Sequence, residues 1–240
     1  MASSKLLSLA LFLVLLTHAI SAIETSFNFP SFNKDDPLIL QGDANISSKG
    51  FLRLTDDTSN SVGRAFYSNP IQIKDSNNVA NLDTNFTFII RAKHPGNSGY
   101  GLTFEIRNLG SHHKPDANAV AVVFDTFSNS IDIDVNSNWP IVTTPCDFGK
   151  YNGEQADVHI TYDSSKNDLR VFLLFTASQV NCSASATLHL ENEVNPWVGV
   201  GFNATSRFET HDVLSWSFSS KFSHHHSPSE RSDILLNQIL

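Results

Sequence analysis

The sequence lacks the short motifs that mark common enzyme classes and metal sites. It contains no G-x-S-x-G or H-E-x-x-H motif and no glycine-rich phosphate-binding loop. Adjacent histidines occur at His112-His113 and at His224 to His226, but no cysteine or carboxylate stands at a structural-zinc spacing from them. We therefore expect a protein that is not an enzyme, and we interpret these histidines as solvated loop residues.

Positive charge is also in short supply. Lys and Arg number 16 against 24 Asp and Glu, which gives a formal net charge of −8 at pH 7. An acidic protein is repelled by nucleic acids and by anionic membrane surfaces, so we expect neither as a partner. The same charge favours solubility at high protein concentration.

No apolar run is long enough to cross a membrane. Leu6 to Leu16 form an apolar stretch of 11 residues after Lys5, and small residues follow at Ala19 and Ser21. A membrane-spanning helix needs about 20 apolar residues. The pattern is typical of a signal peptide, which we predict over residues 1–21, so that the chain enters the secretory pathway without a membrane anchor.

Cysteine is scarce, with only Cys146 and Cys182 in the chain. In an oxidising compartment one disulfide between them is the expected state, and two free thiols or pairing between chains are the alternatives. The disulfide would close a loop of 36 residues. Loop closure of that size stabilises a fold by about 3–4 kcal/mol.

Helical periodicity is missing before the last few residues, and short alternating or apolar runs separated by turn residues take its place. This pattern predicts an all-β protein, an antiparallel sandwich or barrel, and 18 phenylalanines suit the packing between two sheets. We predict one domain over residues 22–222 and a tail at 223–240 that is disordered or trimmed. The predicted strands are Phe51–Leu54, Asn85–Arg91, Leu102–Ile106, Ala119–Phe124, Ile131–Val135, Asp157–Tyr162, Leu169–Leu174, Ala186–Leu190, Val198–Phe202 and Val213–Phe218.

Four N-x-S/T sequons are present, at Asn45, Asn85, Asn181 and Asn203. In a secreted chain each is a candidate for N-glycosylation on the surface. Asn181 is a less favourable site than the others, because its middle residue is Cys182. We expect two of the four to be occupied.

The segment Val120-Ala-Val-Val-Phe-Asp-Thr126 has the pattern of a buried strand that ends in a carboxylate. It resembles the metal-binding strand of legume seed lectins, V-A-V-E-F-D-T. Further matches at Gly63–Tyr67, Asp83–Thr87, Val194–Phe202 and Glu209–Phe218 extend the likeness over nearly the whole chain. The sequence is thus similar to the bean lectin-related family of phytohaemagglutinins, arcelins and α-amylase inhibitors. The resemblance implies a jelly-roll sandwich of two large antiparallel sheets.

The same resemblance implies a degenerate metal site. Family lectins hold Ca²⁺ beside a transition metal, and oxygen-rich sites of this kind need several carboxylates. Asp125, the Phe127 carbonyl and Asn129 remain in this chain, but Val123 replaces the glutamate ligand. The loop that carries the second Asp and the His in the family is missing, so we expect no Ca or Mn cofactor. We expect Asp125 and Asn129 to satisfy a turn instead.

The sugar contacts are altered as well. Family lectins place an Asp before the Gly-Leu-x-Phe strand, where this chain has Tyr100 before Gly101. The glycine-rich loop that follows in true lectins is also absent. We interpret Tyr100, Gly101 and Asn129 as remnants of the sugar site, and we do not expect ordinary monosaccharide binding.

Two features resemble the α-amylase inhibitors of the family. Asn97-Ser98 looks like the point at which inhibitor precursors are cleaved after Asn, and whether this chain is cleaved there stays open. The inhibitor loops carry tyrosines, whereas the corresponding segments here, Thr55–Ser61 and Thr205–Thr210, have none. Arg207 and Phe208 are the candidate replacements for such contacts.

The sequence therefore favours a non-catalytic seed defence and storage protein of the arcelin and α-amylase-inhibitor type. The expected partners are glycoproteins or a digestive α-amylase of seed-feeding insects, and a homodimer is an open alternative to a monomer. One alternative is a specific α-amylase inhibitor activated by cleavage after Asn97, and another is a lectin with weak residual glycan binding. The resemblance implies storage in a seed vacuole.

Overall fold

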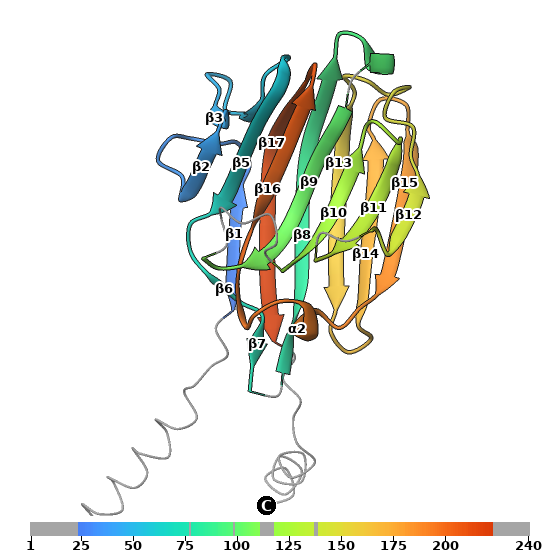
Figure 1. Ribbon diagram of the computed structural model, residues 1–240. Helices are drawn as coiled ribbons and strands as arrows, with labels where there is room; N and C mark the ends of the chain where they lie inside the picture. Colours follow the sequence, from blue (N-terminus) through green and yellow to red (C-terminus); the bar gives the residue numbers. More distant parts are fainter. Residues whose placement is uncertain (1–23, 77, 98, 111–117, 137–138, 223–240) are drawn as a thin grey trace, which may run out of the picture.

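The computed structural model describes residues 24–76, 78–97, 99–110, 118–136 and 139–222. The predicted signal peptide, Ser98 and the predicted tail at 223–240 lie outside the described residues. The described chain forms two antiparallel sheets stacked face to face (Figure 1). The predicted antiparallel sandwich is confirmed.

The back sheet has nine strands within the described residues. Seven of them run in the order β15-β14-β13-β8-β17-β4-β3, while β1 pairs with β17 and β7 with β8. The bounds are β1 Thr25–Phe29, β3 Asn45–Ile46, β4 Leu52–Thr55, β7 Lys74–Asp75, β8 Asn78–Ala92, β13 Gln155–Asp163, β14 Asp168–Phe175, β15 Val180–Thr187 and β17 Glu209–Phe222.

The front sheet has eight strands in the same described part of the chain. Its order is β12-β11-β10-β9-β16-β5-β2, and β6 pairs with β16. The bounds are β2 Leu38–Gly42, β5 Ser59–Tyr67, β6 Ile71–Gln72, β9 Gly99–Asn108, β10 Ala119–Asp125, β11 Ser130–Val135, β12 Val142–Pro145 and β16 Trp197–Arg207.

Helix is limited to two short segments in the described residues, the 3₁₀ turn η1 (Pro95–Asn97) and the helix α2 (Leu190–Glu193). None of the described helices has the length and apolarity needed to cross a membrane. The predicted strand Ala186–Leu190 overlaps β15 only at Ala186 and Thr187, because β15 begins at Val180 and ends at Thr187. Leu188 and Leu190 are both buried with His189 between them, so their spacing imitates a strand.

The core forms because alternate residues of each strand point between the sheets. In β8, Leu82, Phe86 and Phe88 are at most 5% exposed, whereas Asn85 between them faces solvent. The ring of Phe86 contacts Phe202 of β16 in the front sheet, at 5.0 Å between centroids. Truncating a core phenylalanine to alanine costs about 3–5 kcal/mol.

Trp216 of β17 lies at the centre of this aromatic core. It is 1% exposed, and its ring meets Phe202 edge-on at a centroid distance of 4.8 Å. Its indole Nε1 donates a hydrogen bond to Oγ1 of Thr84 at 3.0 Å. The buried donor is therefore satisfied, as a tryptophan in a core requires.

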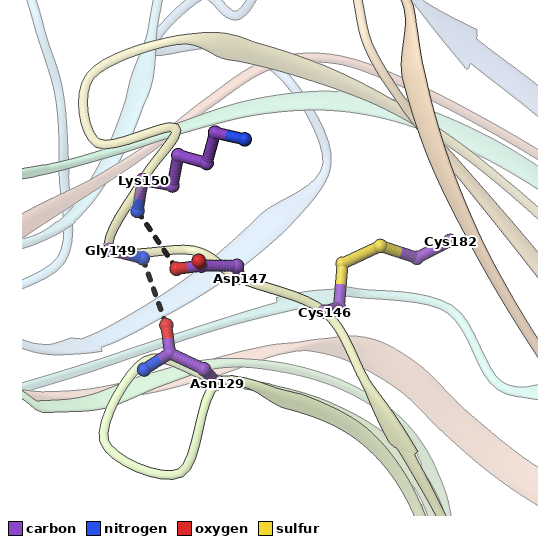
Figure 2. Close-up of a disulfide and its surroundings, with 6 residues drawn as sticks. All are labelled: Asn129, Cys146, Asp147, Gly149, Lys150 and Cys182. Carbon is purple, nitrogen blue, oxygen red and sulfur yellow. Dashed lines mark hydrogen bonds between the residues drawn. A yellow bond between two sulfur atoms is a disulfide. The ribbon is translucent and has the colours of Figure 1, made fainter.

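The two sheets are also joined covalently. Cys146, which follows β12 of the front sheet, is bonded to Cys182 of β15 in the back sheet (Figure 2). Their Cα atoms are 5.9 Å apart, within the usual range for a disulfide. The predicted internal disulfide is confirmed.

Candidate functional site

The candidate site lies where β10 ends and the chain turns into β11. Along β10, Val122 and Phe124 point into the core, while Val123 and Asp125 lie on the outer side and are half-buried. Val123 stands between Thr103 of β9 and Asp132 of β11 in the register of the front sheet. The apolar side chain of Val123 thus occupies the strand position that corresponds to the lost glutamate.

The carboxylate of Asp125 closes the turn that follows. One oxygen, Oδ1, accepts hydrogen bonds from the backbone N–H groups of Phe127 at 2.7 Å and Ser128 at 2.9 Å. Asn129 then adopts a left-handed backbone with φ 55°, a conformation that asparagine tolerates better than most residues. The two hydrogen bonds to the Asp125 carboxylate therefore stabilise this turn.

Asn129 is tied to the segment that carries the disulfide (Figure 2). Its side-chain Oδ1 accepts a hydrogen bond from the N–H of Gly149 at 2.9 Å, and its carbonyl accepts one from the N–H of Cys146 at 2.8 Å. Oδ1 of Asp147 accepts a hydrogen bond from the N–H of Lys150 and stabilises the same segment. The turn is thus connected through Cys146 to the back sheet.

Two aromatic side chains stand exposed beside this turn. Tyr100 is 54% exposed and Phe127 is 63% exposed, and their ring centroids are 6.4 Å apart. Phe127 packs against Gly99, and a Cβ added to Gly99 would lie 3.1 Å from the Cβ atom of Phe127. The sequence predicts Tyr100 as a remnant of a sugar site, and the ring that lies beside it is that of Phe127.

A buried polar network contacts the residues next to Tyr100 and Asp125. Oε1 of Glu209 accepts hydrogen bonds from the N–H of Gly101 at 3.0 Å and the hydroxyl of Thr126 at 2.7 Å, and it lies 3.1 Å from Nε2 of His211. Nδ1 of His211 is 2.6 Å from the hydroxyl of Thr55. Glu209, His211 and Thr55 are all 0% exposed. The N–H of Gly101 is therefore engaged inside the protein.

This network is the closest approach to catalytic geometry in the described residues. A hydroxyl, an imidazole and a carboxylate lie in series, as in a nucleophile activated by a base. No substrate reaches them, because all three side chains are fully buried. The neighbouring Asp212 is held by Arg53 through two hydrogen bonds of 2.8 Å, and this pairing raises the pKa of Arg53.

Comparison with known proteins identifies the family. A profile described as the legume lectin domain matches residues 24–233. The chain belongs to the legume lectin family. Arcelin-5B of Phaseolus vulgaris is 62% identical over the whole of both chains, and α-amylase inhibitor 1 of the same plant is 52% identical over all of this chain and 99% of the other. The solved structure of arcelin-5 from Phaseolus vulgaris has a TM-score of 0.80 at 58% identity, covering 84% of this chain and all of that one.

The donor atoms do not fit the metal pair that legume lectins hold. Val123 offers no ligand atom, and oxygens of Asp125 and Asn129 already accept backbone hydrogen bonds. Calcium takes six to eight oxygen ligands. Across the described ranges, no group of three or more His, Cys, Asp or Glu side chains is placed to hold a metal ion.

Asp132 and Asp134 of β11 lie on the outer face of the front sheet, opposite Val123 and Ala121 of β10. One oxygen of each carboxylate is buried without a hydrogen-bond partner among the described residues. Desolvation, and after it the negative charges of Asp132 and Asp125, raises the pKa of Asp134 to about 6. No ion pair to Asp132 or Asp134 forms among the described residues, so these two neighbouring carboxylates repel each other when both are ionised.

The predicted inhibitor contacts lie near Tyr100. Arg207 ends β16 opposite Gly99. Phe208 follows with φ 64°, is 41% exposed, and donates its N–H to the carbonyl of Thr58 at 3.3 Å. The predicted loop Thr55–Ser61 is too long, because Thr55 belongs to β4 and Ser61 to β5, and both are buried in hydrogen-bonded positions.

The four sequons differ in exposure. Asn45, Asn85 and Asn181 are exposed, on β3, β8 and β15 respectively. Asn203 of β16 is half-buried, and its Oδ1 is buried without a hydrogen-bond partner among the described residues. The first three sites therefore have more room for a glycan than Asn203.

Proposed function

We propose that this chain is a non-catalytic, lectin-like seed defence and storage protein that has no working metal or sugar centre. It would act against seed-feeding insects by resisting digestion and by binding their gut glycoproteins or a digestive α-amylase. The relatives support this proposal, because the solved arcelin-5 is described as a lectin-like defense protein. We also propose that the chain enters the secretory pathway and is stored in a seed vacuole. A homodimer is the alternative to a monomer.

The observation that carries the proposal is the internal use of the residual ligand groups. Asp125 and Asn129 hold the turn through backbone hydrogen bonds, and Val123 leaves the remaining ligand position apolar. A turn held this way does not need an ion to keep its shape. Calorimetric titration with Ca²⁺ and Mn²⁺ should detect no binding, and glycan-array signals should be unchanged by a chelator. Metal-dependent sugar binding would contradict the proposal.

Resistance to digestion would follow from the fold. Proteases cut segments that open locally, and a cross-linked sandwich opens rarely. The disulfide joins the two sheets beside the exposed turn. Incubation with insect gut proteases should leave the oxidised protein intact for longer than the reduced protein. If the oxidised and reduced forms survive equally long, the disulfide is not the cause of resistance to digestion.

Inhibition of an α-amylase is the first alternative. Tyr100 and Phe208 are both exposed near the paired ends of β9 and β16, and exposed aromatics suit an anchoring role in an interface. Pro95–Asn97 forms the η1 turn between β8 and β9, so a cut after Asn97 would fall in a connection and not within a strand.

A panel of insect and mammalian α-amylases, preincubated with the purified protein, tests this alternative. Inhibition that is lost in Phe208→Ala, but kept in the control Phe172→Ala on the back sheet, would support it. No inhibition at micromolar concentration, by protein confirmed to be cleaved after Asn97, would exclude it for the enzymes tested.

Weak glycan binding is the second alternative. The Tyr100 and Phe127 rings could take the apolar face of a sugar without any metal. Binding of this kind should be insensitive to chelators and should disappear in Phe127→Ala. Unchanged binding in that variant would place the contact elsewhere.

A further inference from the structure

A single side chain extends the pairing of β8 beyond the end of β13. The register between these two strands stops at Ile89. Past that point the N–H of Gly153 donates a hydrogen bond to the carbonyl of Ile90 at 2.8 Å. The side chain of Asn152 then pairs with Ala92, because its Oδ1 accepts a hydrogen bond from the N–H of Ala92 at 2.8 Å and its Nδ2 donates one to the carbonyl of Ala92 at 2.9 Å. The amide of Asn152 thus takes the place of a strand residue, and we call these two bonds the Asn152–Ala92 pair.

The Asn152–Ala92 pair lies where β8 leaves the back sheet. Ala92 is the last residue of β8 and is 5% exposed, so its backbone groups need partners inside the protein. The next side chain, that of Lys93, is 77% exposed and reaches the carboxylate of Asp57 at 2.8 Å. From here the chain passes through η1 to β9 and Tyr100. The pair therefore determines how firmly the start of the β8–β9 connection is attached to the sheet.

Asn152 is itself positioned by the segment that the disulfide anchors (Figure 2). The ring of the preceding Tyr151 packs against that of Phe175 in β14, with 4.4 Å between centroids. The following Gly153 has φ +79°, a left-handed conformation that glycine adopts without strain. The residues on both sides of Asn152 are thus fixed, and they direct its side chain towards Ala92.

Asn152 also belongs to the one Asn-Gly pair of the sequence. A glycine after asparagine leaves its backbone nitrogen unhindered, because there is no side chain to shield it. That nitrogen can attack the side-chain carbonyl carbon of the asparagine and close a succinimide ring. Asn152 is exposed, so water can reach the ring and open it. The sequence and the exposure together favour deamidation at Asn152.

The hydrogen bonds of the folded state oppose this reaction. The attacking nitrogen is that of Gly153, whose N–H is bonded to the carbonyl of Ile90, and both ends of the Asn152 amide are bonded to Ala92. The ring closes only when these bonds open together. Local opening at the end of a strand costs less free energy than global unfolding. The rate of deamidation should therefore follow the frequency of this local opening.

The product of deamidation cannot restore the pair. An aspartate at this position still accepts a hydrogen bond from the N–H of Ala92, but its second oxygen replaces Nδ2 and, when ionised, has no proton to donate. Two acceptors then face each other where a hydrogen bond of 2.9 Å now lies, and the carbonyl of Ala92 loses its donor. Isoaspartate adds a carbon to the backbone and displaces the N–H of Gly153 from Ile90. A buried acceptor without a donor is destabilising, so the end of β8 should open more often in the modified chain.

We propose that Asn152 is a deamidation site, and that its conversion to aspartate or isoaspartate loosens the end of β8 and exposes the β8–β9 connection to proteases. In the first step the nitrogen of Gly153 forms a bond to Cγ of Asn152, the bond from Cγ to Nδ2 breaks, and ammonia leaves with the proton from Gly153. In the second step one water molecule adds across either C–N bond of the ring and gives aspartate or isoaspartate. A stored protein would thus lose resistance to digestion with age, a consequence that rests on the storage role in the proposed function.

Ageing of the purified full-length protein tests the site. Peptide mass spectrometry after incubation at mildly alkaline pH should find deamidation at Asn152 ahead of other exposed asparagines such as Asn33. A sub-denaturing concentration of urea should speed deamidation at Asn152 and amide hydrogen exchange at Ala92 by the same factor, because both need the same opening. The site is overturned if Asn152 stays unmodified while exchange at Ala92 rises, or if Asn33 is modified first.

The variant Asn152→Asp tests the consequence. Loss of the donor to the carbonyl of Ala92 should make amide exchange at Ala92 and tryptic cleavage after Lys93 about tenfold faster. The matched control is Asn33→Asp, which makes the same charge change in the exposed connection between β1 and β2 and should behave as wild type. Wild-type rates in Asn152→Asp, or equal rates in the two variants, would overturn the proposal.

Aged wild-type protein gives the same comparison if Asn152→Asp fails to accumulate. Deamidation adds a negative charge, so ion exchange separates the modified from the unmodified chains, and cleavage after Lys93 can be timed in each fraction. Equal cleavage rates in the two fractions would contradict the proposal. Amylase and glycan-binding assays do not enter these measurements, so failure here is distinct from failure of the proposed function.

Discussion

Removing the disulfide should destabilise the fold by a predictable amount. The bond between Cys146 and Cys182 closes a loop of 36 residues, for which the chain-entropy relation gives about 3.8 kcal/mol at 25 °C. For a domain of this size, 1 kcal/mol corresponds to roughly 2–4 °C in Tm, so the double variant Cys146→Ala, Cys182→Ala should melt about 8–15 °C lower. The amide proton of Gly149, which is bonded to Oδ1 of Asn129, should also exchange faster with solvent. The reason is that the segment after Cys146 is no longer anchored to the back sheet.

Urea and thermal unfolding monitored by circular dichroism measure this loss. Cys146 is 3% exposed, so its replacement by alanine also leaves a small cavity. Wild-type protein reduced with a phosphine keeps both sulfur atoms and serves as the control for that effect. If both forms lose less than about 1 kcal/mol, the bond does not act through the entropy of the unfolded chain, and the reasoning is refuted.

Three other substitutions test the site. Glu209→Ala leaves the buried donors of Gly101 and Thr126 without an acceptor, at about 1–3 kcal/mol each, and removes the carboxylate beside His211. Urea unfolding should therefore show a loss of at least ~2 kcal/mol. Glu209→Gln keeps an acceptor and should lose much less. The folded pKa of Asp134 is about 6 against an ordinary 3.8, so the folded state holds this proton more tightly and stability falls as pH rises from about 4 through 6. Asp134→Asn should therefore stabilise the protein by about 1–2 kcal/mol at pH 7.5, allowing for solvent screening of a half-buried group, and should have no effect at pH 4; an equal gain at both values would contradict this. Gly101→Ala should prevent folding, because the φ of Gly101 is +96° and a Cβ there would lie 2.0 Å from the carbonyl oxygen of Phe124. The control Gly96→Ala, where a Cβ would meet open space, should express as wild type.

The fold was predictable where hydrophobic alternation is long and regular. The runs Ile131–Val135 and Asp157–Tyr162 match β11 and β13 to within two residues at each end. The strands β3, β6 and β7 were missed because they have two residues each and carry too few side chains for a period to show. Their pairing is fixed by neighbouring strands that are distant in sequence. The longer strands β1, β2, β5 and β12 were not among the predicted strands either.

The site was predictable only in part. The family motif indicated Asp125 and Asn129, because both belong to one short segment. The Glu209 network gave no local signal, since Thr55, Gly101 and Thr126 are separated from Glu209 by 154, 108 and 83 residues. Such a network becomes visible only when the register of the sheets brings its members together.

The distribution of tryptophan gives the protein a built-in optical probe. Of three tryptophans in the chain, Trp216 is 1% exposed among phenylalanines, whereas Trp139 and Trp197 are 91% and 41% exposed. The fluorescence of Trp216 should therefore be blue-shifted and shielded from iodide, and that of Trp139 should be red-shifted and quenched. Replacing Trp139 and Trp197 by phenylalanine would leave Trp216 as the one tryptophan of the three, so that unfolding between the sheets can be followed separately from events at the surface.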